Sequence, residues 1–347
     1  MAKHNRARRH LPEMGLMLLI SMPASAEWVG DARPMMGTEV SVWLWHDNPD
    51  RGKALVDAVF NEAERINQLM STYIEESSIS AINREAAAAP VVAGEELFTL
   101  IQRSLDISVL TRGAFDITYE SVGQHYDFRK RQRPDDATVA AEKERINFQL
   151  IELDEGAGTV HFLAEGVRIN LGGIAKGYVV ERGVDMLVAR GVQHAIVTAG
   201  GDSRLLGDRR GQPWGIGIRD PRKEGEVAIS VPLSDEAIST SGDYEHAVFD
   251  GAGRRWHHII DTKTGRPADK SLSVTIMTAE GIYADALSTA AFILGPEKAL
   301  RMLSRIAYPA EAVIVGADCK VYLTPKAKKQ IRWTVDLVEG RLPNCTP

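Results

Sequence analysis

The stretch TVHFLAEGVRINLGGIAKGYVVERGVDMLVARG, residues 159–191, contains two patterns that decide the fold class. Strand-like residues over 159–162 and 167–170 flank a tight turn at 164–166, which predicts a β-hairpin. From residue 175 apolar residues recur at helical spacing until Gly191, which predicts a helix over 175–190. Hairpins and helices mixed in this way, without a regular βαβ rhythm, favour an α+β fold over a doubly wound sheet.

The same two patterns continue on both sides of this stretch. The alternation over 40–45 predicts a strand, and helical spacing predicts helices over 55–70, 94–112 and 283–294. Gly113 and the pair Gly295-Pro296 are natural helix ends. The polar residues 126–144 predict a surface excursion that leads into a helix. Further strands are expected at 195–198, 214–219, 227–233, 247–250, 256–260, 273–278, 312–315 and 320–323. Largely antiparallel sheets with packed helices are therefore expected.

The composition is that of an ordinary globular protein. The chain has 347 residues, of which 44% are hydrophobic and 25% charged, with a net charge of -6. This length is enough for two domains or for one elaborate domain. Because the net charge is mildly negative, we expect no nucleic-acid partner. An anionic ligand would need a metal ion or a helix N-terminus to bind it.

The first 26 residues have the pattern of a secretory signal peptide. A basic segment with Lys3, Arg6, Arg8 and Arg9 precedes the short apolar stretch 14–22, and residues 23–26 supply an A-x-A cleavage pattern. The apolar stretch is too short to span a bilayer. We therefore expect export and a mature chain that begins near Glu27, with a buried N-terminal helix as the alternative.

Two cysteines, Cys319 and Cys345, are the only ones in the chain. In an oxidising compartment they are able to pair, but spacing alone does not supply the geometry of a disulfide. They lack zinc-site spacing. A disulfide and a pair of separate thiols both remain open.

The segment NLGGIAKGY, residues 170–178, lies between the expected strand and helix. Its glycines would let a ligand approach the backbone, the helix start would point N–H groups at an anion, and Lys176 adds a positive charge. The spacing is not that of a Walker A loop. The alternative is a purely structural turn.

Asp285 and Thr289 lie four residues apart and hence on one face of the expected helix 283–294. A carboxylate and a hydroxyl so placed suit Mg²⁺, which needs few protein ligands when phosphates and water complete its coordination. The alternative is that Asp285 interacts with the helix dipole and Thr289 with the backbone.

His257 and His258 lie near one end of the expected strand 256–260. Adjacent strand residues point to opposite faces, so at most one of the two faces a given site. A histidine is a natural general base for a hydroxyl nucleophile at neutral pH. The alternative is a solvated histidine pair in a hairpin.

Eight short motifs together resemble those of the ApbE flavin transferase family, in the same order. The resemblance extends from about residue 34 to about residue 323. The motifs are MGT at 36–38, MSTY at 70–73, GAFDIT at 113–118, NLGGIAKGY at 170–178, AGGD at 199–202, ISTSGDYE at 238–245, HHIIDTKTGRPA at 257–268 and YADALSTA at 283–290.

The resemblance implies a T-fold-like α+β domain over residues 27–347 that acts as a periplasmic FAD:protein FMN transferase. Such an enzyme uses Mg²⁺ to cleave FAD, transfers FMN to a threonine of a target flavoprotein and releases AMP. The enzyme would meet the inner membrane only peripherally, through that target.

Site roles are carried over from the family position by position. Mg²⁺ would be held by the Gly173 carbonyl, Asp285 and Thr289. His258 is the expected base, with His257 in reserve. The FAD would be surrounded by Met36, Tyr73, Ala114, Phe115, Asp116, Asn170, Lys176, Ile259 and Ser288.

Two positions depart from the family pattern, and two other activities remain open. The family usually has Asp at the position of Asn170 and Pro at that of Thr262. We expect the Thr262 change to be harmless and the Asn170 change to affect details of ligand contact. A Mg²⁺-dependent FAD pyrophosphatase would use the same site, and an exported, non-catalytic FAD-binding protein would retain FAD without forming AMP.

Overall fold

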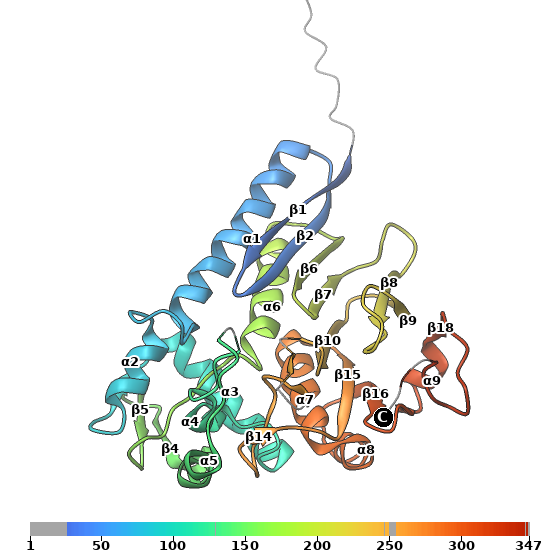
Figure 1. Ribbon diagram of the computed structural model, residues 1–347. Coiled ribbons are helices and arrows are strands. Elements are labelled where there is room, and N and C mark those ends of the chain that lie inside the picture. The colour runs from blue at the N-terminus through green and yellow to red at the C-terminus, as the bar shows by residue number, and fades with distance from the viewer. Residues whose placement is uncertain (1–25, 129, 246, 250–254, 344, 346–347) are drawn as a thin grey trace, which may run out of the picture.

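An eight-stranded sheet in which every neighbouring pair is antiparallel forms the centre of the molecule (Figure 1). The structure is a computed structural model that describes residues 26–128, 130–245, 247–249, 255–343 and 345, so the predicted signal peptide lies outside it except for Ala26. In spatial order the strands are β1 (Glu27–Met35), β2 (Thr38–His46), β6 (Ala195–Ala199), β7 (Asp202–Leu206), β10 (Ala237–Gly242), β15 (Ser271–Thr278), β16 (Ala310–Gly316) and β17 (Val321–Leu323).

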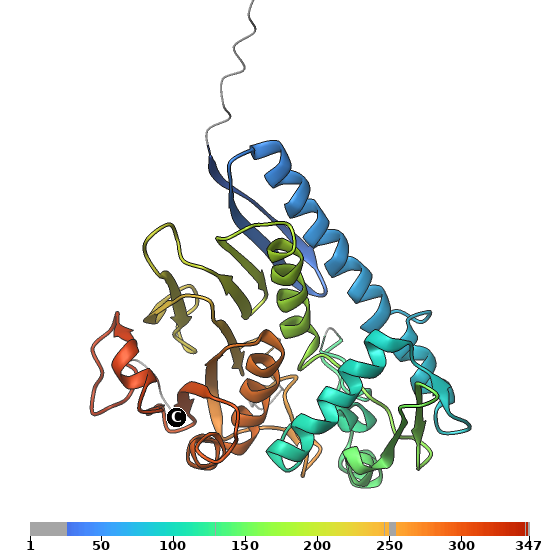
Figure 2. The same ribbon diagram turned by 180° about the vertical axis from the view of Figure 1, so that it is seen from behind.

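In the described part of the chain, four helices cover one face of this sheet, and three of them lie in front of it in Figure 2 as the blue, yellow-green and orange helices. They are α1 (Pro49–Met70), α6 (Ala175–Val188), α7 (Gly281–Leu294) and α8 (Pro296–Leu303). The strand sequences show why both faces are covered. In β16, Ala312 and Ile314 pack with α7 and α8, whereas Val313 and Val315 join a second core on the opposite face.

A three-stranded sheet covers that opposite face. It consists of β8 (Trp214–Arg219), β9 (Val227–Leu233) and β18 (Arg332–Trp333), and α9 (Ala327–Gln330) precedes β18. The Cys319–Cys345 disulfide is formed and ties the C-terminal segment to this core. The question that the spacing left open is thus answered.

A second lobe surrounds the end of α1 at the bottom left of Figure 1. Its sheet has the order β3 (Val91–Val92), β5 (Thr159–Phe162), β4 (Ile151–Asp154). Its helices are α2 (Ser78–Glu85), α3 (Glu95–Thr111), α4 (Glu120–Gly123) and α5 (Asp136–Glu142), with 3-10 turns η1 (Ile117–Tyr119), η2 (Lys143–Arg145) and η3 (Phe148–Leu150). Among the described residues, no helix combines the length and apolarity needed to span a membrane.

Most of the predicted elements are confirmed, and so is the α+β class with antiparallel sheets. The helix over 94–112 is present as α3, which ends where Arg112 and Gly113 both adopt positive φ. The polar segment 126–144, predicted to lead into a helix, instead contains the short helix α5.

The hairpin predicted over 159–170 is wrong in its second strand. β5 pairs with β3 and β4, while residues 167–170 belong to no sheet. Their backbone groups bind side chains and turns instead: Asn83 bonds to both backbone polar groups of Ile169, and Asn170 N–H donates to the Ile117 carbonyl. Local alternation cannot distinguish these partners from a neighbouring strand.

Two other expectations need correction. Residues 256–260 do not form one strand but are divided between β12 (Arg255–Trp256) and β13 (Ile260–Asp261), which pair with β11 (Val248–Phe249) and β14 (Arg266–Pro267). Gly295 does not only end α7, because it also directly precedes α8. Pro296 at the first position of α8 explains this second role.

The helices α6 and α7 cross so closely that their backbones touch. A Cβ atom built on Gly177 would lie 2.2 Å from the Gly281 carbonyl oxygen, and one built on Gly281 would lie 2.5 Å from the Gly177 carbonyl oxygen. No side chain larger than hydrogen fits at either position without moving a helix. The crossing places the start of α6 against the first turns of α7.

Replacing Gly177 by Ala should lower the free energy of unfolding by about 1–3 kcal/mol, because the added methyl group overlaps backbone atoms that cannot rotate away. Urea unfolding followed by circular dichroism measures this effect. Gly215→Ala in β8 is the matched control, since nothing lies within 4 Å of its Cβ position, and it should change stability by less than about 0.5 kcal/mol. Equal stability of the Gly177 variant and the control would contradict the close crossing.

Candidate active site

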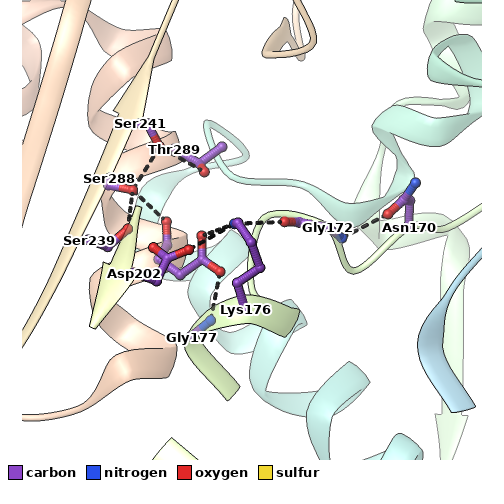
Figure 3. A network of polar contacts seen from close by, with 10 residues as sticks. Asn170, Gly172, Lys176, Gly177, Asp202, Ser239, Ser241, Ser288 and Thr289 are labelled. Carbon is purple, nitrogen blue, oxygen red and sulfur yellow. Dashed lines mark hydrogen bonds and ion pairs between the residues drawn. The ribbon is translucent and has the colours of Figure 1, made fainter. Parts of the chain in front are cut away.

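The predicted glycine turn leads directly into α6 and is shaped by the Asn170 side chain (Figure 3). Asn170 Oδ1 accepts a hydrogen bond from Gly172 N–H at 2.7 Å. Its Nδ2 donates to Thr72 Oγ1 at 3.2 Å and to Glu120 Oε2 at 3.0 Å. The amide therefore joins the turn to two other segments. An aspartate at this position would have no hydrogen to donate to Glu120.

Asp285 of α7 caps the start of α6 from outside that helix. Its Oδ2 accepts a hydrogen bond from Gly177 N–H at 2.9 Å, and its Oδ1 lies 3.5 Å from Lys176 Nζ. The sequence predicts that N–H groups at the start of this helix point at an anionic ligand. For Gly177 this is wrong, because its N–H donates to the Asp285 side chain. The close crossing of the two helices makes the contact feasible.

A second buried carboxylate, Asp202 at the start of β7, lies 3.0 Å from the same Lys176 ammonium. Burial, together with the neighbouring Asp202 charge, raises the pKa of Asp285, although Lys176 opposes this. Burial alone would lower the pKa of Lys176, but the two carboxylates raise it. With all three groups ionised, the cluster has one negative charge in excess, which favours a cation.

A band of hydroxyl groups extends from this cluster along α7 and β10. Ser288 Oγ lies 3.1 Å from Ser239 Oγ and 2.8 Å from Ser241 Oγ, and it donates to the Asp285 carbonyl. The half-buried Thr289 follows, with its Oγ1 at 3.5 Å from Ser241 Oγ. Figure 3 shows Ser288 and Thr289 of α7 close to Ser239 and Ser241 of β10.

Gly173 lies across from Thr289. A Cβ atom on Gly173 would lie 3.4 Å from Thr289 Oγ1 and 3.3 Å from the Phe115 ring. Of the predicted metal-binding residues, Gly173 is thus close to Thr289, and Asp285 precedes Thr289 by one turn of α7. Carbonyl, carboxylate and hydroxyl oxygens are donors suited to Mg²⁺. The described residues contain no group of three or more His, Cys, Asp and Glu side chains that could hold a metal ion, so the predicted set depends on the glycine and the threonine.

The two predicted histidines have different surroundings. His257 is 4% exposed, with Nε2 2.8 Å from the Ala268 carbonyl oxygen and Nδ1 accepting from Ile259 N–H, and burial lowers its pKa. His258 is partly exposed, its Nδ1 lies 3.1 Å from the Glu245 carbonyl oxygen, and its ring meets Phe128 edge-on. These surroundings favour His258 over His257 for proton transfer.

The predicted FAD-binding residues of the GAFDIT segment lie beside the glycine turn. Ala114 and Phe115 are buried, and Phe115 is next to Gly173. Asp116 is also buried and accepts hydrogen bonds from Thr118 N–H, Thr118 Oγ1 and Phe148 N–H, so its carboxylate is committed to the local fold.

The remaining predicted residues lie farther around the site. Met36 has a positive φ of 53° in the two-residue turn between β1 and β2 and lines an open hollow of about 600 Å³. Tyr73 is 85% exposed, directly after Thr72, which bonds to Asn170. Ile259 is buried in the core beneath α7.

Thr262 has a function that the sequence did not suggest. Its Oγ1 donates to the Gly113 carbonyl at 2.6 Å, which joins the histidine segment to the GAFDIT segment. Sequence reasoning also missed Asp202 and Glu120 as members of the site. Asp202 stood in a recognised motif without a role, and nothing in the sequence singled out Glu120.

Burial raises the pKa of Glu120 from its ordinary value of 4.5 to about 7, although the hydrogen bond from Asn170 opposes this. Between these two pH values the folded protein retains a proton that the unfolded chain has released, so stability should fall as the pH rises. The free energy of unfolding of the parent should therefore decrease between the two pH values, and Glu120→Gln should make this decrease about 1–3 kcal/mol smaller.

Urea unfolding of both proteins at pH 5 and pH 8 measures this difference. Glu39→Gln, at an exposed position in β2, is the control and should retain the parent pH profile. A pH profile that is unchanged in the Glu120 variant would contradict the raised pKa.

Solved structures with the same fold define the class of this protein. The crystal structure of the ApbE protein from Thermotoga maritima matches 88% of this chain and 99% of its own, with a TM-score of 0.82 and 30% identity. The flavin transferase ApbE from Vibrio cholerae matches the same shares with a TM-score of 0.76 and 28% identity.

Sequence relatives agree with this class. The chain is 32% identical over 291 residues to the FAD:protein FMN transferase of Treponema pallidum, covering 78% of this chain and 80% of the relative. It is 30% identical over 316 residues to the one from Vibrio cholerae, covering 87% and 92%. The model of the ApbE family matches residues 36–314. The chain belongs to the ApbE family.

Proposed function

We propose that this chain is an FAD:protein FMN transferase, which moves FMN from FAD to a threonine of a target flavoprotein and releases AMP. The observation that carries the proposal is the placement of Gly173 beside Thr289, with Asp285 one helical turn earlier on α7 and paired with Lys176. A flavin-binding protein without catalysis would not need a cation site at the diphosphate. Relatives that are named FAD:protein FMN transferases match this chain over most of their length, which supports the same activity.

The cation site would hold Mg²⁺ through the Gly173 carbonyl, Asp285 and Thr289. A bound Mg²⁺ would neutralise and polarise the diphosphate of FAD. Lys176 would add positive potential beside it, and Asn170 would keep the glycine turn in shape.

Around the nucleotide we assign the other predicted contacts. Phe115 and Ala114 would contact the FAD beside the glycine turn, and exposed Tyr73 offers a ring for stacking. Met36, Asp116, Ile259 and Ser288 would complete the surroundings, Asp116 and Ile259 through their backbone, because their side chains are committed to the fold.

His258 is our candidate for the general base. Its Nδ1 contact with the Glu245 carbonyl favours the tautomer with the proton on Nδ1, which makes Nε2 the basic nitrogen. Nε2 would take the proton of the acceptor threonine, whose oxygen then forms a bond to the FMN-side phosphorus. The bond from that phosphorus to the bridging oxygen breaks, and AMP leaves with the electron pair.

The enzyme would act in the periplasm after export. The Cys319–Cys345 disulfide supports this location, because structural disulfides persist mainly in oxidising compartments. Contact with the inner membrane would then be peripheral, through the target flavoprotein.

Incubation with FAD, Mg²⁺ and a candidate acceptor flavoprotein tests the proposal. Flavin fluorescence should remain on the acceptor band after denaturing electrophoresis, with one AMP released per label. EDTA should abolish the label, and so should replacement of the acceptor threonine by valine. Free FMN and AMP without a labelled band would instead favour the pyrophosphatase, and FAD retained without AMP would favour a binding protein.

His258→Ala should slow transfer by about 10²–10⁴-fold while FAD binding stays close to that of the parent, because a base is needed only for the reaction step. Acceptor labelling rates and FAD titration measure the two quantities separately. His161→Ala, at a partly exposed histidine of β5, is the control and should label at the parent rate. A normal rate in the His258 variant would move the base elsewhere.

A further inference from the structure

Asp202 is a buried charged residue of the site to which the proposed function gives no task. Its side chain is 3% exposed, and its Oδ2 lies 3.0 Å from Lys176 Nζ. Within the described part of the chain, that oxygen accepts no hydrogen bond besides this ion pair. A carboxylate buried in this way is costly unless its charge is compensated.

The backbone of Asp202 is held from both sides, so its carboxylate has little freedom to move. It pairs with Ala199 of β6 and with Ser239 of β10. The preceding Gly201 packs so closely on β10 that a Cβ there would lie 2.7 Å from the Thr240 carbonyl oxygen. Asp202 is therefore held in place, and the flexible Lys176 side chain forms an ion pair with it.

The lysine lies closer to Asp202 than to Asp285. Nζ is 3.0 Å from Asp202 Oδ2 but 3.5 Å from Asp285 Oδ1 (Figure 3). Asp285 is separately fixed by the Gly177 N–H on its other oxygen. Asp285 Oδ1 is thus held less tightly than Asp285 Oδ2, which accepts the Gly177 N–H.

We propose that Asp202 is a positioning residue that keeps the contact of the Lys176 ammonium with Asp285 Oδ1 long, at 3.5 Å, so that a divalent cation is able to displace the lysine from Asp285 before FAD binds. This inference rests on the proposed metal site. Without the Asp202 charge, Asp285 is the one carboxylate among the described residues that remains within 4 Å of the ammonium. The lysine would then close onto Asp285 and compete with the cation.

The test uses Asp202→Asn, which keeps the shape of the side chain and removes its charge. Mn²⁺ is titrated into the nucleotide-free protein, and the free ion is followed by electron paramagnetic resonance. We expect Asp202→Asn to bind Mn²⁺ about tenfold more weakly, because charges in a buried site are only slightly screened. Asp220→Asn, also at a buried aspartate but outside this cluster, should bind Mn²⁺ like the parent.

A second readout separates lysine closure from a simple loss of negative charge. In a metal-free crystal structure of Asp202→Asn, Lys176 Nζ should lie within about 3 Å of Asp285 Oδ1, the distance of a direct charged hydrogen bond. The crystal structure is the readout that separates the two explanations, because the double variant Asp202→Asn/Lys176→Gln removes the competing ammonium and also restores the net charge of the parent cluster. The double variant should regain the parent affinity for Mn²⁺.

The inference is overturned if the parent takes up no Mn²⁺, if Asp202→Asn binds it as tightly as the parent, or if the lysine does not move onto Asp285. A double variant as weak as the single one would also overturn it. These outcomes are separate from acceptor labelling. A parent that fails to label an acceptor but shows the expected Mn²⁺ pattern would refute the transferase and leave the role of Asp202 intact.

Discussion

The contact between the backbones of α6 and α7 at Gly177 and Gly281 is the constraint on which the site depends. It brings Gly177 N–H within 2.9 Å of Asp285 and sets the glycine turn opposite Thr289. A larger residue at the crossing would separate the helices and with them the oxygen donors. The same packing that closes the core thus determines where a cation and a diphosphate would bind.

The site also has an electrostatic consequence. Two buried carboxylates share one ammonium, so the ionised protein has unbalanced negative charge in a place where solvent screens poorly. A divalent cation bound between the protein and a diphosphate would neutralise this negative charge, and this attraction would strengthen binding of the cation. Binding of metal and of nucleotide are therefore expected to support each other.

Much of this arrangement could be predicted from the sequence, because the decisive signals are local. Asp285 and Thr289 share a helix face by spacing alone, and the glycine turn before α6 is visible as a motif. Other features depend on contacts between distant segments. Asp202 reaches Lys176 only through the pairing of β7 with β6 and β10, and residues 167–170 are held by Asn83 and a turn instead of a strand. The periodicity of the sequence does not predict contacts between segments that are distant along the chain.

A crystal structure of the protein with FAD and Mg²⁺ would test the central claim most directly. We predict that the diphosphate lies against residues 172–176, with the cation bound by Asp285 and Thr289. A structure in which the diphosphate binds elsewhere, with Asp285 still paired only to Gly177 and Lys176, would contradict the account.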